Sequence, residues 1–155
     1  MPIYNAPLAD MRFILNDVFN AEQFCQNNEG LAHLDGATVD AILEEMAKFA
    51  QNVTLPLNRS GDEEGARIED GQVYTPAGFK QAFRQFAEGG WIGLGAEEEW
   101  GGQGMPKMLT VLTDEMLFST NPSFQLYPLL SIGAGMALNS YASEEQKQTF
   151  LPKIY

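Results

Sequence analysis

The stretch Asp35–Leu57, with the sequence DGATVDAILEEMAKFAQNVTLPL, carries the clearest helical pattern in the chain. Its apolar residues recur at intervals of three and four positions, which places them on one face of an α-helix: Val39, Ile42, Leu43, Met46, Phe49, Ala50 and Val53. A proline disfavours helical backbone at the residue before it, so Leu55-Pro56 is expected to close the pattern. The stretch therefore predicts one long amphipathic helix with a face available for packing.

Five further segments show helical periodicity or helix boundaries on either side of this helix. They are residues 8–18 after Pro7, the segment from Pro76 to Gly89 with Phe79, Phe83 and Phe86, the segment after Pro106 with Leu109, Leu112, Met116 and Leu117, the segment Pro122–Tyr141, and the segment that begins with the capping box of Ser143 and Gln146. We expect an all-α fold, an up-and-down helical bundle of about five to six helices with a Gly-rich loop.

Three segments between the expected helices should be irregular. Residues 20–36 are interpreted as a polar connector, and residues 58–75 as a loop with Gln72-Val73-Tyr74 as at most a short extended piece. Between Gly89 and Gly104, seven of the sixteen residues are glycine. This density is incompatible with regular structure and predicts a tightly folded loop.

The segment Pro122–Tyr141, PSFQLYPLLSIGAGMALNSY, is apolar on nearly every side. Such a helix is expected in the middle of a bundle or against another domain, and Pro128 must either kink it or start it. Gly133 and Gly135 each cost about 1 kcal/mol relative to alanine in a helix. Close packing of a neighbouring helix is the simpler explanation for them, and close approach of a ligand is the alternative.

The chain carries 9 Lys and Arg against 21 Asp and Glu, a formal net charge of −12. Most of such a surface repels nucleic acid and anionic membranes, although a specific pocket for an anionic metabolite stays open. The apolar runs are shorter than the roughly 20 residues that span a bilayer. Cys25 is a single cysteine and no leader precedes Tyr4, so we expect a reducing, cytoplasmic compartment.

No catalytic constellation stands out from the residues alone. The single histidine, His33, lacks the glutamate three residues earlier that di-metal bundles use, so no metal site is expected. Cys25 and His33 both fall in the polar connector, where a free thiol and a surface imidazole are a simpler interpretation than a nucleophilic pair. Gly93-x-Gly95 lacks the third glycine of a dinucleotide fingerprint, and Glu97–Glu99 is interpreted as a solvated acidic loop.

Two stretches nevertheless resemble the acyl-CoA dehydrogenase family. The first is Gly90-Trp-Ile-Gly-Leu-Gly95 with Glu99-Trp-Gly-Gly-Gln-Gly104, and the second is Ala142-Ser-Glu-Glu-Gln-Lys-Gln-Thr-Phe-Leu-Pro-Lys-Ile154. Their order and separation are similar to those of the family's helical N-terminal domain, and the resemblance covers about four fifths of the chain. The opening, Tyr4–Phe13, looks like the extension of a larger bacterial subgroup that includes enzymes similar to 3-methylmercaptopropionyl-CoA dehydrogenase.

The resemblance implies a function for the whole protein. Members of the family remove hydrogens from the α and β carbons of an acyl-CoA thioester, using a glutamate base and FAD, and pass electrons to electron-transfer flavoprotein. The base and most flavin contacts would lie outside this chain, so no catalytic or cofactor-binding residue is assigned. The acyl chain in the family runs along a helix similar to Phe124–Met136, which implies four substrate-binding residues: Phe124, Gln125, Leu129 and Ile132.

The resemblance also implies a division into residues 1–34, an extension with a short helix, and residues 35–155, the family's N-terminal helical domain. The abrupt apolar ending at Tyr155 is expected to be a cut in a longer polypeptide. Apolar surface left uncovered by that cut predicts self-association, and we expect a homo-oligomer. The alternative is a stand-alone acidic helical module that binds another protein through an exposed apolar face and has no catalytic activity.

Overall fold

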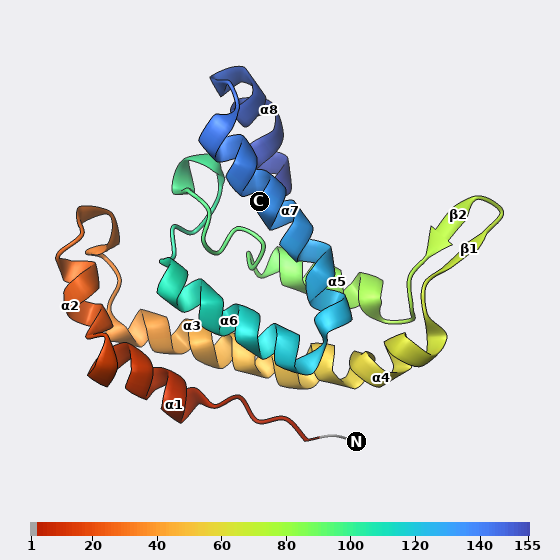
Figure 1. The fold of residues 1–155 in the computed structure, drawn as a ribbon, viewed down its shortest axis with the longest axis horizontal. Coiled ribbons are helices and arrows are strands. Elements are labelled where there is room, and N and C mark those ends of the chain that lie inside the picture. Colours follow the sequence, from red (N-terminus) through yellow and green to blue (C-terminus); the bar gives the residue numbers. More distant parts are fainter. Residues whose placement is uncertain (1–2) are drawn as a thin grey trace.

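The computed structural model describes residues 3–155, which are built mainly of helices (Figure 1). This confirms the expected all-α fold. Along the chain the elements are α1 (Leu8–Phe13), a π-helical turn (Ile14–Val18), α2 (Ala21–Gln26), a 3₁₀ turn (Glu29–Leu31), α3 (Gly36–Phe49), a second π-helical turn (Ala50–Thr54), α4 (Leu55–Glu64), β1 (Arg67–Glu69), β2 (Gln72–Tyr74), α5 (Phe79–Glu88), a second 3₁₀ turn (Glu98–Trp100), α6 (Lys107–Thr120), α7 (Pro122–Tyr141) and α8 (Glu144–Ile154).

The helices form a base and an upright arm. Helices α3 and α4 make one long rod, α6 packs beside α3, and α7 rises from the end of α6 to meet α8 (Figure 1). The β1–β2 hairpin stands at one end of the rod, while α1 and α2 lie toward the other end (Figure 1). In the part of the chain that the structure describes, none of the helices is sufficiently long and apolar to traverse a bilayer.

The rod does not end at Pro56, so the expected boundary there was wrong and residues 58–64 are helical. The π-helical turn widens the backbone spacing, and the N–H of Leu55 bonds to the carbonyl of Ala50 five residues earlier. Pro56 then occupies the first turn of α4, where its missing N–H has no helical partner to lose. The π-helical turn thus accommodates a proline that, from the sequence, is expected to end the helix.

The rest of the segment expected to be a loop forms a short hairpin. Strands β1 and β2 pair antiparallel, with Ile68 opposite Val73, which confirms the extended piece at residues 72–74. Asp70 and Gly71 both have positive φ, 50° and 75°, as a two-residue hairpin turn of type I′ requires. Aspartate followed by glycine is a typical sequence for this turn, so the signal was present in the chain.

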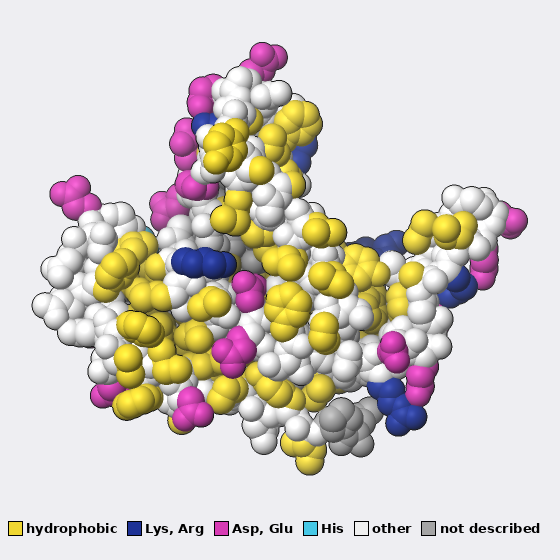
Figure 2. Space-filling model, in the orientation of Figure 1, with side chains coloured by type: hydrophobic (Ala, Val, Ile, Leu, Met, Phe, Trp, Pro, Cys, Tyr) yellow, Lys and Arg dark blue, Asp and Glu magenta, His cyan; other side chains and the backbone are white. Residues whose placement is uncertain are grey.

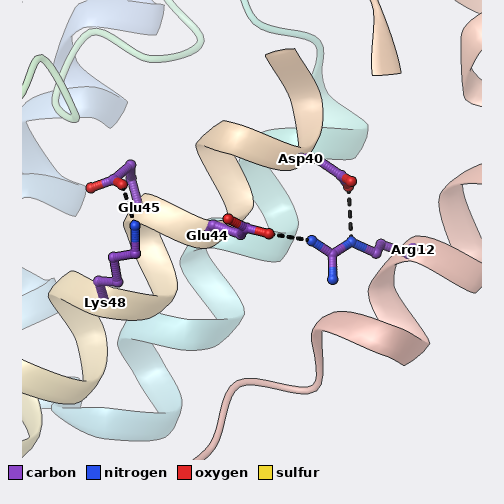
Figure 3. Close-up of polar contacts among 5 residues, drawn as sticks. All are labelled: Arg12, Asp40, Glu44, Glu45 and Lys48. Carbon is purple, nitrogen blue, oxygen red and sulfur yellow. Dashed lines mark hydrogen bonds and ion pairs between the residues drawn. The ribbon is translucent and has the colours of Figure 1, made fainter. Parts of the chain in front are cut away.

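The N-terminal residues pack onto α3 and share its core. Met11 and Leu15 are buried there, and Arg12 pairs with Asp40 at 3.0 Å and with Glu44 at 2.7 Å (Figure 3). Figure 3 also shows the separate pair of Lys48 and Glu45 further along α3. The contact is therefore both apolar and ionic.

The expected polar connector, residues 20–36, is not simply a loop, because it contains α2 and a 3₁₀ turn. Ala21, Cys25 and Leu34 from this segment are buried. Ala21 and Cys25 are four residues apart and therefore share one face of α2. One short helical turn among polar residues gives too weak a periodicity to recognise in the sequence. Burial raises the pKa of the Cys25 thiol, which disfavours the reactive thiolate.

Four phenylalanine rings join the helices in the core. The Phe124 ring centroid lies 5.8 Å from that of Phe86 and 6.1 Å from those of Phe49 and Phe79. These spacings are those of favourable tilted and edge-to-face aromatic pairs. The start of α7 is thereby fixed against α3 and α5.

Candidate functional site

The start of α7 is anchored by a buried polar cluster. The Asn121 side chain accepts a hydrogen bond from the Phe124 N–H at 2.9 Å and donates one to the Thr54 carbonyl at 3.1 Å. The hydroxyls of Thr54 and Thr120 lie 2.7 Å apart and share a hydrogen bond. Since these buried groups all have partners, the cluster holds the N-terminus of α7 rigidly on the second π-helical turn.

The outer face of α7 is apolar and uncovered. The helix contains no charged residue over its 20 positions, yet Leu130 is 74% exposed, Met136 60% and Tyr141 91%. Figure 2 shows hydrophobic side chains following the position of α7 down the middle of the view. Of the two environments expected for this helix, enclosure within the bundle is not found. Within residues 3–155, this outer face is exposed.

Pro128 lies inside α7 and is buried, so it does not start the helix. The two glycines have different surroundings. A Cβ on Gly135 would lie 2.5 Å from the Tyr155 hydroxyl, so this glycine admits close packing of the C-terminal residue. A Cβ on Gly133 would meet nothing within 4 Å. The packing explanation therefore holds for Gly135, and Gly133 belongs to the open face.

The four residues expected to line an acyl chain occupy two environments. Phe124 and Gln125 are buried within the domain, whereas Leu129 and Ile132 are only partly buried. Ile132 lines one cavity and Phe124 lines another. The structure therefore does not bring all four to a single cavity in the described residues, and their role in substrate binding stays a prediction.

The first cavity, which we call the α7 groove, lies between α7, α6 and the glycine-rich loop and has a volume of about 360 Å³. Its apolar lining includes Ile132 and Met136, and Tyr155 lies against it. Asp114 on α6 is the partly buried acid of this groove. Burial raises the pKa of Asp114, although Lys107 and the hydrogen bond from Gln125 act in the opposite direction. Sequence periodicity did not point to Asp114, because α6 was interpreted from its apolar residues alone.

The second cavity, which we call the hairpin groove, lies between the hairpin, α5 and the start of α7, with a volume of about 370 Å³. Its lining is mostly aromatic, and Lys80 is its charged residue. Lys80 is not among the residues to which the sequence patterns pointed. Its spacing of four residues from Arg84, with Phe83 between them, was the available signal.

The glycine-rich loop is folded on itself and forms one wall of the α7 groove. Most of its backbone N–H groups donate to carbonyls of the loop or of the end of α5; the donors are Trp91, Leu94, Ala96, Trp100, Gly101, Gly102, Gln103, Gly104 and Met105. A phosphate cradle needs several free N–H groups that converge on one point. The loop is thus a scaffold, and its acidic residues Glu97–Glu99 add further repulsion to a phosphate.

No metal centre is formed by the part of the chain described here, since it has no group of three or more His, Cys, Asp or Glu that could hold an ion.

Comparison with known proteins accounts for this helical scaffold. Residues 37–155 match the family model described as "Acyl-CoA dehydrogenase, N-terminal domain". The chain belongs to the acyl-CoA dehydrogenase family. The matched region begins at the start of α3 and includes both grooves, the glycine-rich loop and α7.

Three relatives illustrate the similarity. The chain is 36% identical over 151 residues to 3-methylmercaptopropionyl-CoA dehydrogenase of Ruegeria pomeroyi, covering 97% of this chain and 26% of that protein. It is 32% identical over 120 residues to butyryl-CoA dehydrogenase of Syntrophomonas wolfei, covering 76% of this chain and 20% of that protein. It is 27% identical over 152 residues to a broad-specificity linear acyl-CoA dehydrogenase of Mycobacterium tuberculosis, covering 96% of this chain and 24% of that protein.

The chain therefore spans about a fifth to a quarter of the length of these relatives. The alignment with the Ruegeria pomeroyi enzyme covers most of residues 1–34 as well. The division of the chain at residue 34 stays a prediction, although the N-terminal residues share the core of the family domain.

Proposed function

We propose that this chain is the N-terminal domain of an FAD-dependent acyl-CoA dehydrogenase and that α7 forms one wall of its acyl-chain pocket. The observation that carries the proposal is that α7 has no charged residue and exposes apolar side chains along one side. It does so within a domain of the acyl-CoA dehydrogenase family. Apolar surface of this extent is unfavourable in water, at about 25 cal/mol per Å². An acyl chain and the protein around it would remove that surface from water.

The proposed reaction is α,β-dehydrogenation. A base would take the α proton of the thioester, and a bound flavin would supply the acceptor for the β hydrogen as hydride, so that a carbon–carbon double bond would form between the two carbons. The side chains of residues 3–155 would contribute shape rather than proton transfer, because the outer surface of α7 is apolar. Electron-transfer flavoprotein would reoxidise the flavin, and the whole protein would be a homo-oligomer in the cytoplasm.

The four α7 residues would divide this work. Leu129 and Ile132 are partly exposed and would contact the acyl chain directly. Phe124 and Gln125 are buried and would instead fix the helix through the phenylalanine cluster and through Asp114. Substitution of Leu129 or Ile132 should therefore affect substrate affinity more, whereas substitution of Phe124 or Gln125 should affect the stability of the fold more.

The described residues do not fit a complete FAD site. The glycine-rich loop uses most of its N–H groups internally, and its neighbouring carboxylates would oppose a pyrophosphate. We therefore place the flavin with parts of the whole protein other than residues 3–155, and none of the residues named here is assigned a step of flavin chemistry.

The test is expression of the complete coding sequence beside a protein of residues 1–155 alone. The complete protein is expected to show flavin absorbance and to reduce an electron-accepting dye when an acyl-CoA is added, whereas residues 1–155 alone should do neither. A complete protein that retains its helical fold but has no flavin and no acyl-CoA-dependent activity would reject the proposal.

A second candidate is a non-catalytic protein-interaction module. It is favoured by four exposed apolar side chains on the N-terminal helical segments, Phe13, Val18, Phe19 and Phe24. A stop codon after Tyr155 in the natural gene, together with stable capture of one protein partner through these side chains, would support that candidate over the dehydrogenase.

A further inference from the structure

The hairpin groove has the size and lining of a small-ligand site. Its volume of about 370 Å³ lies within the range of cavities that bind small molecules. Phe79 and Phe124 are buried beneath it, whereas Phe83 and Tyr127 are partly exposed at its sides. The complete lining is Val73, Thr75, Phe79, Lys80, Phe83, Phe124 and Tyr127.

Lys80 differs from most basic residues of this acidic chain. Six of the nine Lys and Arg side chains lie within 4.0 Å of a carboxylate: Arg12, Lys48, Arg59, Arg67, Lys107 and Lys147. Within residues 3–155, Lys80, Arg84 and Lys153 have no such partner. Two of these three cations therefore lie on α5.

Lys80 and Arg84 also lie one helical turn apart. Side chains at positions i and i+4 are neighbours on a helix surface, and two like charges there repel each other. An anion held beside Lys80 would relieve that repulsion. The chain has 21 Asp and Glu but supplies no carboxylate within ion-pair distance of either cation in its described part.

We propose that the hairpin groove binds a small amphiphilic monoanion, a free fatty acid. Its carboxylate pairs with the Lys80 ammonium, supported by Arg84, and its alkyl tail packs against Phe83 and Tyr127, above the buried Phe79 and Phe124. This site is separate from the α7 groove and does not depend on the proposed dehydrogenase activity. The two cavities share α7 but have no lining residue in common.

The Lys80 ammonium at the edge of an apolar groove favours an anionic amphiphile over a neutral one. A neutral alkyl chain would need only the aromatic side chains, and an alkyl cation would be repelled by Lys80 and Arg84. A short carboxylate such as acetate would gain the ion pair but no apolar contact, and an exposed ion pair by itself raises the affinity only about 1.4- to 5-fold. Both parts of the ligand are therefore required.

The first experiment titrates a ¹⁵N-labelled protein of residues 1–155 with sodium decanoate and follows the backbone amide resonances. The decanoate concentration is kept below that at which decanoate forms micelles. The expected result is saturable shifts at Val73, Thr75 and Phe83, with little change at Met136 and Asn139 of the α7 groove. Decanol and decyltrimethylammonium should bind more weakly at these positions, and acetate should produce no saturation. Equal binding of the three ten-carbon probes, or shifts confined to the α7 groove, would overturn the proposal.

The second experiment compares matched variants. Lys80→Gln should weaken decanoate binding about 1.4- to 5-fold, as expected for one exposed ion pair. Lys153→Gln, which removes the unpaired cation on α8, should leave the affinity unchanged. Far-ultraviolet circular dichroism checks that each variant is folded, and Phe83→Ala provides an independent variant of the apolar wall that should also weaken binding. Unchanged affinity in both Lys80→Gln and Phe83→Ala, or equal losses in Lys80→Gln and Lys153→Gln, would refute the site.

Discussion

The side-chain amide of Gln125 donates a hydrogen bond to the Asp114 carboxylate across 2.9 Å, joining α7 to α6. The oxygen of the same amide is buried and has no hydrogen-bond partner in the described residues. An unsatisfied buried acceptor costs free energy, and a carboxylate removed from water costs more when its pairing is incomplete. The pair therefore links the position of α7 to the protonation state of Asp114.

The first prediction concerns pH. Because burial raises the pKa of Asp114, the folded protein binds this proton more tightly than the unfolded chain does. The contribution of Asp114 to the free energy of unfolding is then largest below its unfolded pKa of about 3.9 and declines as pH rises through the folded pKa. In urea denaturation over this pH range, Asp114 should make the free energy of unfolding fall as the pH rises. This part of the fall should be absent in Asp114→Asn. Glu99→Gln on the exposed acidic loop is the control, and an identical pH slope in Asp114→Asn and in the unsubstituted protein would contradict the prediction.

At neutral pH, Asp114→Asn should also stabilise the protein, by roughly 0.5–1 kcal/mol. The new amide can donate to the buried oxygen of Gln125 after a rotation, whereas a carboxylate cannot. The loss of the long 3.9 Å contact with Lys107 should be small, since Lys107 is largely exposed. A lower free energy of unfolding in this variant would show that the ion pair outweighs the amide contact.

The second prediction concerns the N-terminal helices. Arg12→Gln removes two exposed ion pairs and should lower the free energy of unfolding only slightly. This loss should be smaller still in high salt, which screens exposed ion pairs. Met11→Ala removes a buried side chain on the neighbouring position and should cost about 2–5 kcal/mol. Chemical denaturation of both variants checks this order. A larger loss in Arg12→Gln would mean that the N-terminal residues are held on α3 by charge rather than by burial.

The third prediction uses the two glycines of α7 as a matched pair. Gly133→Ala fills open space and should stabilise the helix by about 0.5–1 kcal/mol. Gly135→Ala meets the Tyr155 ring, so it should gain little or lose stability as the ring is displaced. Combined with Tyr155→Ala, the Gly135→Ala substitution should become as favourable as Gly133→Ala. Thermal denaturation of the double-mutant cycle measures this coupling, and strict additivity would exclude it.

The fourth prediction concerns the glycine-rich loop. A Cβ on Gly102 would overlap the backbone of Ala96, which cannot move aside as a flexible side chain could. Gly102→Ala should therefore destabilise the protein by about 1–3 kcal/mol or more. Gly36→Ala at the start of α3 has open space around it and serves as the control. Equal stability of the two variants in urea would show that the loop can relax around the added methyl group.

The fifth prediction belongs to the complete enzyme. Ile132→Ala should lower kcat/KM for acyl-CoA substrates whose chains reach this residue by about tenfold, because it removes apolar contacts from the proposed wall. Val111→Ala on the exposed side of α6 should change it little. Steady-state kinetics with acyl-CoA of several chain lengths makes the comparison, and an equal effect of the two substitutions at every length would remove Ile132 from the pocket.

The sequence pattern located most of the helices because their burial follows local periodicity. The helix expected from Asp35, the helix from Phe79, the helix after Pro106 and the Ser143 capping box all rest on residues within one or two turns. The errors arose where a local signal was overridden. At Pro56 a π-helical turn removed the expected break, and in residues 20–36 a few buried side chains stabilised a helix that has little periodicity of its own.

The candidate sites depended much more on tertiary structure. The amino-acid sequence by itself determined the all-α class, the apolar character of α7 and the motifs shared with the family, because periodicity, composition and short motifs are local properties. Only the folded chain decided that α7 is open on one side, that Phe124 and Ile132 face different cavities, and that Lys80 lies beside aromatic side chains with no carboxylate of residues 3–155 within ion-pair distance. Exposure and pairing depend on side chains distant in sequence, and no local pattern specifies which of them meet.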